Sequence, residues 1–351
     1  MKPYLYLRGL RQMDHTVFSV ENGQKTYWDP IFNNRLPYSS GQQVKRSILD
    51  AMVETMEDEK RAPITFNYQI TSGKDGKDSL AQKEPWSPCD PLHADQLIGG
   101  WMRAQSSELT LKRRSPLSIS AMRPLHPTLA RTSEESLTFD RSENPSHNPV
   151  RVRNAEGELL SDEAVNEFLR SNTRSLPRRH WIPSDKVGSR AEGLFVYDVA
   201  IDLRRLFKVS TNRHDPELTE AKEAELREEG WIEKGEFLVC PADRREEIIP
   251  ALAHALINWR ITSNQSRTYS PQPTLAIAIS DNANLLAAAI RADLREEGKK
   301  ADPVLEKVRG AELYIALSAK GYVPGVMGSA EALANAEHDL TEQLKAFEYE
   351  V

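Results

Sequence analysis

The chain has 351 residues, of which 28% are charged and 39% are hydrophobic, and its formal net charge at pH 7 is −6. No apolar run reaches the roughly 20 residues of a membrane-spanning helix, so no membrane partner is expected. Two cysteines, Cys89 and Cys240, are too few for a disulfide framework or a thiolate metal site. The expected compartment is a reducing cytoplasm, and the length accommodates several domains or one core with large insertions.

The acidic net charge conceals two basic stretches. Residues 101–131 contain 6 basic and 1 acidic side chains, and residues 170–190 again contain 6 and 1. Local patches rather than net charge decide whether a surface attracts phosphates. A nucleic-acid partner is therefore compatible with this composition.

The first predicted elements are a strand and a hairpin. The strand begins at Tyr4–Leu7 and leads into Arg8 and Arg11. Residues 13–28 are typical of a hairpin that turns at Asn22-Gly23. Residues 29–37 continue as an extended segment, because Pro37 disfavours a helical conformation in the residue before it.

A helix is predicted directly after this extended segment. Ser40 is a good N-cap, and Gln43 three residues later completes a capping box. The apolar residues of 44–52 recur at helical spacing, so one face of the helix is expected to be buried. Lys45 and Arg46 lie near the helix start, where the macrodipole disfavours cations by roughly 0.3–1 kcal/mol each. Free amides, hydroxyls and two cations together indicate an anion site, and the alternative is a capped surface helix with solvated charges.

The middle of the chain is less regular. Residues 64–70 alternate apolar and polar side chains, which predicts a half-buried strand. Residues 71–91 are expected to form a loop, and a short helix is expected at 93–102. Residues 111–127 are basic and hydroxyl-rich, which suits either a surface that binds an anionic chain or a solvated loop.

Residues 132–192 form the least regular part of the sequence. One helix is predicted at 162–170, and a basic stretch that contains Trp181 follows it. An excursion of this length between core elements is usually functional. An aromatic side chain among arginines suits base stacking combined with phosphate contacts.

The C-terminal half returns to regular elements. Strands are predicted at 194–203, 237–239, 274–279 and 313–317, and helices at 215–229, 244–259, 283–294 and 331–347. The coarse order is strand–helix–strand, a long interruption, then strand–helix–strand. The predicted fold is α+β, with the split βαββαβ pattern of the ferredoxin-like or RRM-like fold and large insertions.

The sequence carries no motif for a metal, a cofactor or a catalytic nucleophile. The histidines are scattered without ligand spacing, and neither a GxGxxG nor a Walker loop is present. No cofactor, no metal and no catalytic residue are therefore expected.

Binding is better supported than catalysis. Segments 39–46, 103–123 and 263–270 concentrate cations, amides and hydroxyls of the kind that contact phosphates and 2′-hydroxyls. Residues 263–270 are equally compatible with an ordinary helix-to-strand loop. The residues expected to bind RNA are Arg8, Arg11, Ser39, Ser40, Gln42, Lys45, Arg46, Arg103, Lys112, Arg113, Arg114, Arg178, Arg179, Trp181, Arg260, Gln265, Arg267 and Tyr269.

Four motifs occur in an order that resembles a known family. They are RLPYSSGQQVKR at 35–46, KRRSPLSIS at 112–120, LFVYDVAIDL at 194–203 and SNQSRTY at 263–269. Together they resemble the DevR-like branch of the "Cas seven" family, the backbone subunits of CRISPR Cascade-type effectors in the RAMP superfamily. The match covers roughly residues 1–280, and the glycines beyond it only loosely echo the glycine-rich loop of many relatives.

The resemblance implies an RRM-like palm formed by residues 1–70 and 193–320, and a C-terminal helix at 321–351. It implies a finger-like insertion at 71–131 and a thumb at 132–192. Several copies would form a helical filament along a CRISPR RNA (crRNA), with other CRISPR effector subunits and with target DNA or RNA paired to the guide. The chain would then bind guide RNA by phosphate and shape recognition, for antiviral defence.

Two alternatives belong to different classes. The first is a RAMP ribonuclease that cleaves target RNA, because RNA-slicing relatives carry an acidic residue shortly before an Asp-Pro pair. The acidic candidates here are Asp14, Glu21 and Asp29. The second alternative is a protein scaffold that never contacts RNA.

Overall fold

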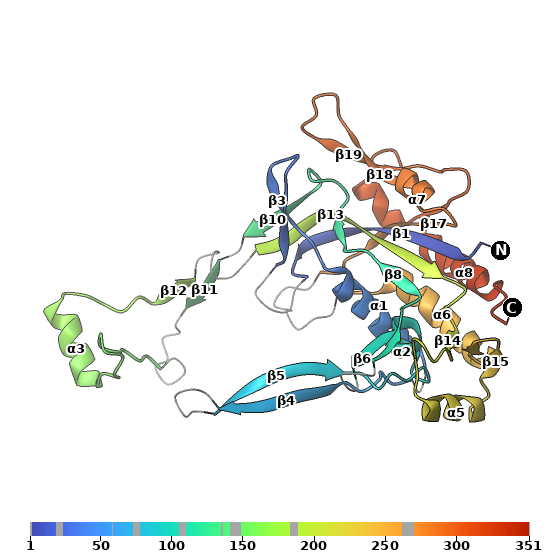
Figure 1. Cartoon of the computed structure of the whole chain (residues 1–351). Helices are drawn as coiled ribbons and strands as arrows, with labels where there is room; N and C mark the ends of the chain where they lie inside the picture. The colour runs from blue at the N-terminus through green and yellow to red at the C-terminus, as the bar shows by residue number, and fades with distance from the viewer. Residues whose placement is uncertain are drawn as a thin grey trace. The chain divides into compact units, whose positions relative to one another are not determined.

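The computed structural model describes residues 2–18, 24–57, 59–72, 78–104, 110–134, 136–140, 149–182, 189–261 and 270–350. The chain divides into two compact units. The larger one combines Met1–Thr132 with Ala191–Val351, and the smaller one is Ser133–Arg190. Helices and antiparallel strands both contribute to the larger unit, which confirms the α+β class (Figure 1).

A sheet of seven strands forms the centre of the larger unit. β1 (Tyr4–Thr16) pairs antiparallel with β13 (Ser189–Asp202) on one side and with β17 (Thr274–Ser280) on the other. β20 (Glu312–Ile315) extends the sheet beyond β17. Three further strands pair with β13: β8 (Leu117–Ile119), β9 (Arg123–Pro124) and β10 (Ala130–Glu134).

The order of these elements along the chain is β1, α1 (Gly41–Thr55), β8, β13, α6 (Ala242–Asn258) and β17. In space, β1 and β13 lie between β17 and β8. This alternation is compatible with the split βαββαβ pattern, but residues 64–70 do not supply its second strand. β8 occupies that position instead.

Residues 64–70 were expected to be a half-buried strand, and the burial was wrong. They fall in β4 (Thr65–Ser72), which pairs only with β5 (Asp78–Trp86) in a separate hairpin. Phe66 is 68% exposed and Ile70 is 70% exposed. A two-residue period reveals that a strand has an apolar face, but it does not reveal whether another element covers that face.

Two hydrophobic clusters lie on opposite faces of the central sheet, because successive strand residues point to opposite sides. One face carries Leu7 and Phe195 and packs under α1, α6 and α8 (Ala332–Lys345). The other carries Leu10 and Val196 and packs under α7 (Ala283–Ala289). Figure 1 shows α1 and α7 near opposite faces of β1.

The predicted helix at 283–294 was too long. α7 ends at Ala289, and residues 290–294 form β18 (Ile290–Leu294), which pairs with β19 (Ala301–Leu305). Ala and Leu have high helix propensity, so propensity does not mark this boundary. The pairing with β19 determines where the helix stops.

The remaining elements surround the sheet. The turn predicted at Asn22-Gly23 lies outside the described residues. Within the segment expected to be extended, residues 30–33 form a turn that joins β2 to β3. The bounds are β2 Thr26–Asp29, β3 Asn34–Pro37, α2 Ala94–Gly99, β6 Trp101–Ala104, β7 Thr110–Arg113, β14 Lys208–Ser210, α5 Glu220–Glu228, β15 Ile232–Lys234, β16 Phe237–Val239 and η1 Leu317–Gly321.

The structure describes two strands and a helix within the smaller unit. β11 (Leu137–Asp140) pairs with β12 (Arg179–Ile182), and α3 (Asp162–Ser171) begins after an N-cap at Ser161. The predicted helix at 162–170 is thus confirmed. None of the described apolar side chains between 133 and 190 is buried.

We predict that Gly41→Ala destabilises the larger unit. A Cβ at Gly41 would lie 2.7 Å from the carbonyl oxygen of Ile119, and this backbone atom has little freedom to move. The expected loss of unfolding free energy is about 1–3 kcal/mol, measured by urea denaturation. Gly321→Ala is the matched control, because nothing lies within 4 Å of its ideal Cβ. Equal midpoints for both variants would contradict the crowding at Gly41.

Candidate nucleic-acid interface

The start of α1 has the properties of an anion-binding end. Ser40 is the N-cap, as predicted, and its Oγ accepts a hydrogen bond of 3.4 Å from the Gln43 amide. The amides of Gly41 and Gln42 have no acceptor inside the helix. No acidic residue lies in the first turn. The positive end of the helix is therefore not neutralised by its own side chains.

This helix start is fixed against the segment that follows β8. Ser39 and Met122 exchange two backbone hydrogen bonds, of 2.9 and 3.0 Å. The Ser120 hydroxyl accepts a hydrogen bond of 2.8 Å from the amide of Asp198 in β13. Three of the four sequence motifs, 35–46, 112–120 and 194–203, therefore meet at one place in the sheet. The fourth motif, at 263–269, lies outside the described residues.

Lys45 does not point toward the helix start, contrary to our expectation. Its Nζ donates a hydrogen bond of 2.6 Å to the carbonyl of Gly99, the last residue of α2. Burial, reinforced by the charge of Arg113, lowers the pKa of Lys45 to about 8. Lys45 thus joins α1 to the end of α2. Arg46 is more exposed and pairs with Asp50 at 2.9 Å.

Arg113 lies in the interior, so its expected role in RNA binding was wrong. It is 2% exposed, and it donates hydrogen bonds to the carbonyls of Leu97, Arg205 and Lys208. Burial lowers its pKa to about 10. The alternation of β7 explains this placement, because Leu111 and Arg113 point inward while Lys112 is exposed. A basic run on a strand splits into outward and inward cations.

Arg11 and Arg8 are also held within the larger unit. Arg11 is 1% exposed and donates to the carbonyl of Ile257 at 3.0 Å. Its guanidinium carbon lies 4.1 Å from the ring centroid of Trp259, and burial lowers its pKa. Arg8 points to the other face and forms two hydrogen bonds with Asp198, of 2.6 and 3.1 Å. The buried Arg11 is therefore not accessible to a ligand at the surface. The charge of Arg8 is paired with the Asp198 carboxylate.

The remaining expected residues fall into three groups. Ser39 is buried, and Arg103 stacks over the Trp86 ring with its guanidinium carbon 4.8 Å from the centroid. Gln265, Arg267, Tyr269 and the side chain of Trp181 lie outside the described residues. The exposed members are Gln42, Arg46, Lys112, Arg114 and Arg260 in the larger unit, and Arg178 and Arg179 in the smaller one. Arg179 pairs with Asp140 at 2.7 Å.

The β2–β3 hairpin carries exposed aromatic residues that the sequence analysis did not assign to the interface. Trp28 is 55% exposed and Tyr27 is 37% exposed. Arg123 of β9 is also exposed. The sequence feature that could have indicated this exposure is the adjacent Tyr27-Trp28 pair, because neighbouring strand residues point to opposite faces and a short strand does not bury both.

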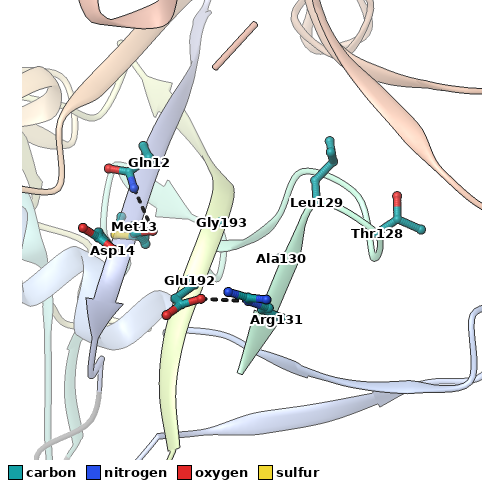
Figure 2. Close-up of a pocket in the computed structure, with 9 residues that line it drawn as sticks. All are labelled: Gln12, Met13, Asp14, Thr128, Leu129, Ala130, Arg131, Glu192 and Gly193. Carbon is teal, nitrogen blue, oxygen red and sulfur yellow. Dashed lines mark hydrogen bonds and ion pairs between the residues drawn. The ribbon is translucent and has the colours of Figure 1, made fainter. Parts of the chain in front are cut away.

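A cavity of about 570 Å³ lies where β1, β10 and β13 meet (Figure 2). Asp14 and Glu192 contribute carboxylates to its lining, and Arg131 Nε binds Glu192 Oε2 at 2.8 Å. The only cation of the lining is thus paired, and Asp14 adds a further negative charge. The charge of this lining therefore disfavours a phosphate.

The acidic residues considered for a ribonuclease have different environments. Asp29 Oδ1 accepts hydrogen bonds from the amides of Ile31 and Phe32, at 3.1 and 2.7 Å, and so organises the β2–β3 turn. Asp14 is exposed, and Glu21 lies outside the described residues. Within the described part of the chain, no three His, Cys, Asp or Glu side chains cluster as a metal site would require. Nor does it include a helix long and apolar enough to span a membrane.

Comparisons with known proteins give structural matches only. No family model and no curated protein matches the sequence. One solved structure, a "CRISPR RNA-guided surveillance complex, pre-nicking", matches with a TM-score of 0.43 and 10% identity over 97% of this chain and 88% of the other. A "CRISPR RNA-guided surveillance complex" matches with a TM-score of 0.38 and 9% identity, over 97% and 84%. Both TM-scores are below 0.5, so the function is inferred below from this chain's own residues.

The two cations of the opening motif are predicted to differ in their effect on stability. Lys45→Ala removes a hydrogen bond and leaves the Gly99 carbonyl without this donor, which should cost about 1–3 kcal/mol. Arg46→Ala removes only an exposed i,i+4 pair and should cost less than about 0.5 kcal/mol. Thermal melting and urea denaturation of both variants measure the difference. A Lys45→Ala variant as stable as the parent would show that the bond to Gly99 is dispensable.

The lowered pKa of Lys45 also predicts a dependence of stability on pH. Between its folded pKa of about 8 and its ordinary value of 10.5, the unfolded chain retains a proton that the folded chain has lost. The unfolding free energy of the parent should therefore rise with pH in this window, by up to about 1.4 kcal/mol per pH unit, relative to Lys45→Met. Urea titrations of both proteins from about pH 8 to pH 10 test this difference. Parallel profiles would mean that the pKa is not lowered.

Proposed function

We propose that this chain is a guide-RNA-binding backbone subunit of a Cascade-type CRISPR surveillance complex, present in several copies along the crRNA. It binds the RNA through phosphates and shape and performs no chemistry itself. Its further partners are neighbouring copies of itself in a filament, other effector subunits, and the target DNA or RNA paired to the guide. The proposed compartment is the cytoplasm.

The smaller unit carries this proposal. A folded segment normally buries apolar side chains to offset the entropy lost on ordering. In the described part of Ser133–Arg190, none is buried, and Phe139 and Phe168 are 55% and 49% exposed. Arg170, Arg174 and Arg178 are exposed as well. Exposed aromatic and cationic side chains without a core favour binding to RNA, because bases stack on the rings and phosphates attract the arginines.

The larger unit supports the same proposal. Its α1 start offers amides and a polar cap without an acidic side chain in the first turn. Three of the four motifs that resemble the RAMP family meet around this helix start. These two observations favour a phosphate-binding surface on the palm. They do not depend on the identity of any base.

The absence of catalysis belongs to the same proposal. Asp29 Oδ1 accepts two backbone hydrogen bonds within the hairpin, so this oxygen stabilises the β2–β3 turn. Asp14 and Glu192 lie near one another at the cavity, but Arg131 neutralises Glu192. The ribonuclease alternative predicts cleavage of target RNA at regular spacing in the presence of magnesium, which the assembled complex can be assayed for. The scaffold alternative predicts no nucleic acid in the purified complex.

We predict that removal of the smaller unit abolishes most RNA binding while the larger unit stays folded. Thr132 and Ala191 are close, because Arg131 bonds to Glu192 on the paired strand. Residues 133–190 can therefore be replaced by Asn-Gly, the preferred two-residue hairpin turn. The unfolding midpoint should change little, because none of the described apolar side chains in this unit is buried.

RNA affinity at several salt concentrations is the measurement. The intact chain should lose affinity steeply with salt and show little preference for spacer sequence, and the deletion variant should show a shallower slope. The matched control in the same unit is Glu163→Ala with Glu167→Ala, which removes exposed acidic charges from α3 and should not weaken binding. Equal affinity and equal salt slope for the deletion variant would contradict the role of this unit.

A further inference from the structure

Trp28 differs from the other tryptophans that the structure describes. It is 55% exposed, and none of the described cations lies over its ring. Trp86 is 39% exposed, but the Arg103 guanidinium covers it at 4.8 Å from the ring centroid. The others are buried: Trp101, Trp231 and Trp259. Trp28 therefore presents an aromatic surface to solvent.

The hairpin that carries Trp28 is fixed from its inner side. Leu36 is fully buried. The Asn34 side chain donates a hydrogen bond of 3.3 Å to the carbonyl of Pro127. The ring of Phe32 packs edge-on against His126, with centroids 4.8 Å apart. A rigid support lowers the entropy cost of binding, so Trp28 is well placed to contact a ligand.

The surroundings of Trp28 favour a nucleobase over a protein partner. Arg35 lies directly opposite Trp28 on β3 and is exposed. Its Nη1 reaches Thr26 Oγ1 at 3.4 Å, which leaves the Trp28 ring uncovered. A stable protein interface needs a contiguous, well-packed patch of about 800 Å² on each partner. Here Trp28 shares its face of the hairpin with Thr26, Arg35 and the buried Pro37.

The hairpin also lies close in sequence to the helix start. Ser40 follows Arg35 by five residues, which places their Cα atoms at most about 17 Å apart. Trp28, Arg35 and the start of α1 are thus within reach of one short single-stranded segment. A phosphate at the helix amides and a base on the ring are compatible with a single bound strand.

We propose that Trp28 is a stacking platform for one base of single-stranded RNA, with Arg35 contacting the adjacent phosphate. This inference rests on the proposed RNA-binding function and specifies a contact that the phosphate-based recognition does not require. Stacking on an aromatic ring tolerates any base, because every base has a π face. The platform therefore adds affinity without adding sequence specificity.

The test uses the full-length chain and single-stranded RNA oligonucleotides, compared with oligonucleotides of equal length that lack bases. Trp28→Ala should weaken binding of the intact RNA about 5- to 150-fold and should leave binding of the abasic strand unchanged. Trp28→Phe should recover most of the affinity, because it retains a ring. Ile31→Ala is the matched control, since Ile31 is 83% exposed in the same hairpin but lies in its turn. It should bind as the parent does.

Four outcomes would overturn the platform. If the parent does not bind RNA, the proposed function fails together with it. If the parent binds RNA and Trp28→Ala binds equally well, the platform alone fails. The same holds if Trp28→Ala weakens the abasic strand as much as the intact RNA, or if it disrupts only self-association of the chain. Melting temperatures of all variants confirm that each one is folded.

Discussion

The position of the α1 start depends on a close backbone contact. An ideal Cβ at Gly41 would lie 2.7 Å from the Ile119 carbonyl oxygen, so only glycine fits here without a shift. The bonds between Ser39 and Met122 hold the same two segments together. Since β8 also pairs with β13, this contact fixes the helix start against the middle of the sheet. The glycine of the opening motif is thus explained by packing, and the free amides beside it are a consequence of where the helix begins.

Several cations of the motifs stabilise the same framework instead of facing a ligand. Arg113 joins the carbonyls of Leu97 and Lys208, and Lys45 binds the carbonyl of Gly99. The lowered pKa values of Lys45 and Arg113 show that burial opposes their charge. Carbonyl acceptors offset part of that cost, because hydrogen bonds to charged groups contribute about 1.5–3 kcal/mol each. A cation count along the sequence therefore overestimates the charge available to a ligand at the surface.

The sequence predicted the elements better than their surroundings. Ser40 as an N-cap, the helix at 162–170 and the core strands followed from local patterns, and the structure confirms them. The sequence could not predict that β4 lacks a covering element, nor that Arg113 points inward. Both features depend on contacts between segments far apart in the chain. The site residues were hardest to predict for the same reason. The charge of a side chain is a local property, but its exposure is set by the whole fold.

The exposed residues offer the remaining candidate contacts. Once the inward cations are assigned to the framework, the groups left to contact a ligand include the amides at α1, the Trp28–Arg35 pair, and the exposed Phe139, Phe168, Arg170 and Arg174 of the smaller unit. These groups differ in how rigidly the fold holds them. Trp28 rests on a hairpin with a buried inner face, whereas α3 of the smaller unit buries none of its residues. A preorganised platform loses little entropy on binding, whereas exposed side chains that pack against nothing lose rotamer freedom when they bind. If RNA is the ligand, as proposed, a contact with the Trp28 hairpin would therefore cost less entropy than a contact with the exposed side chains of the smaller unit.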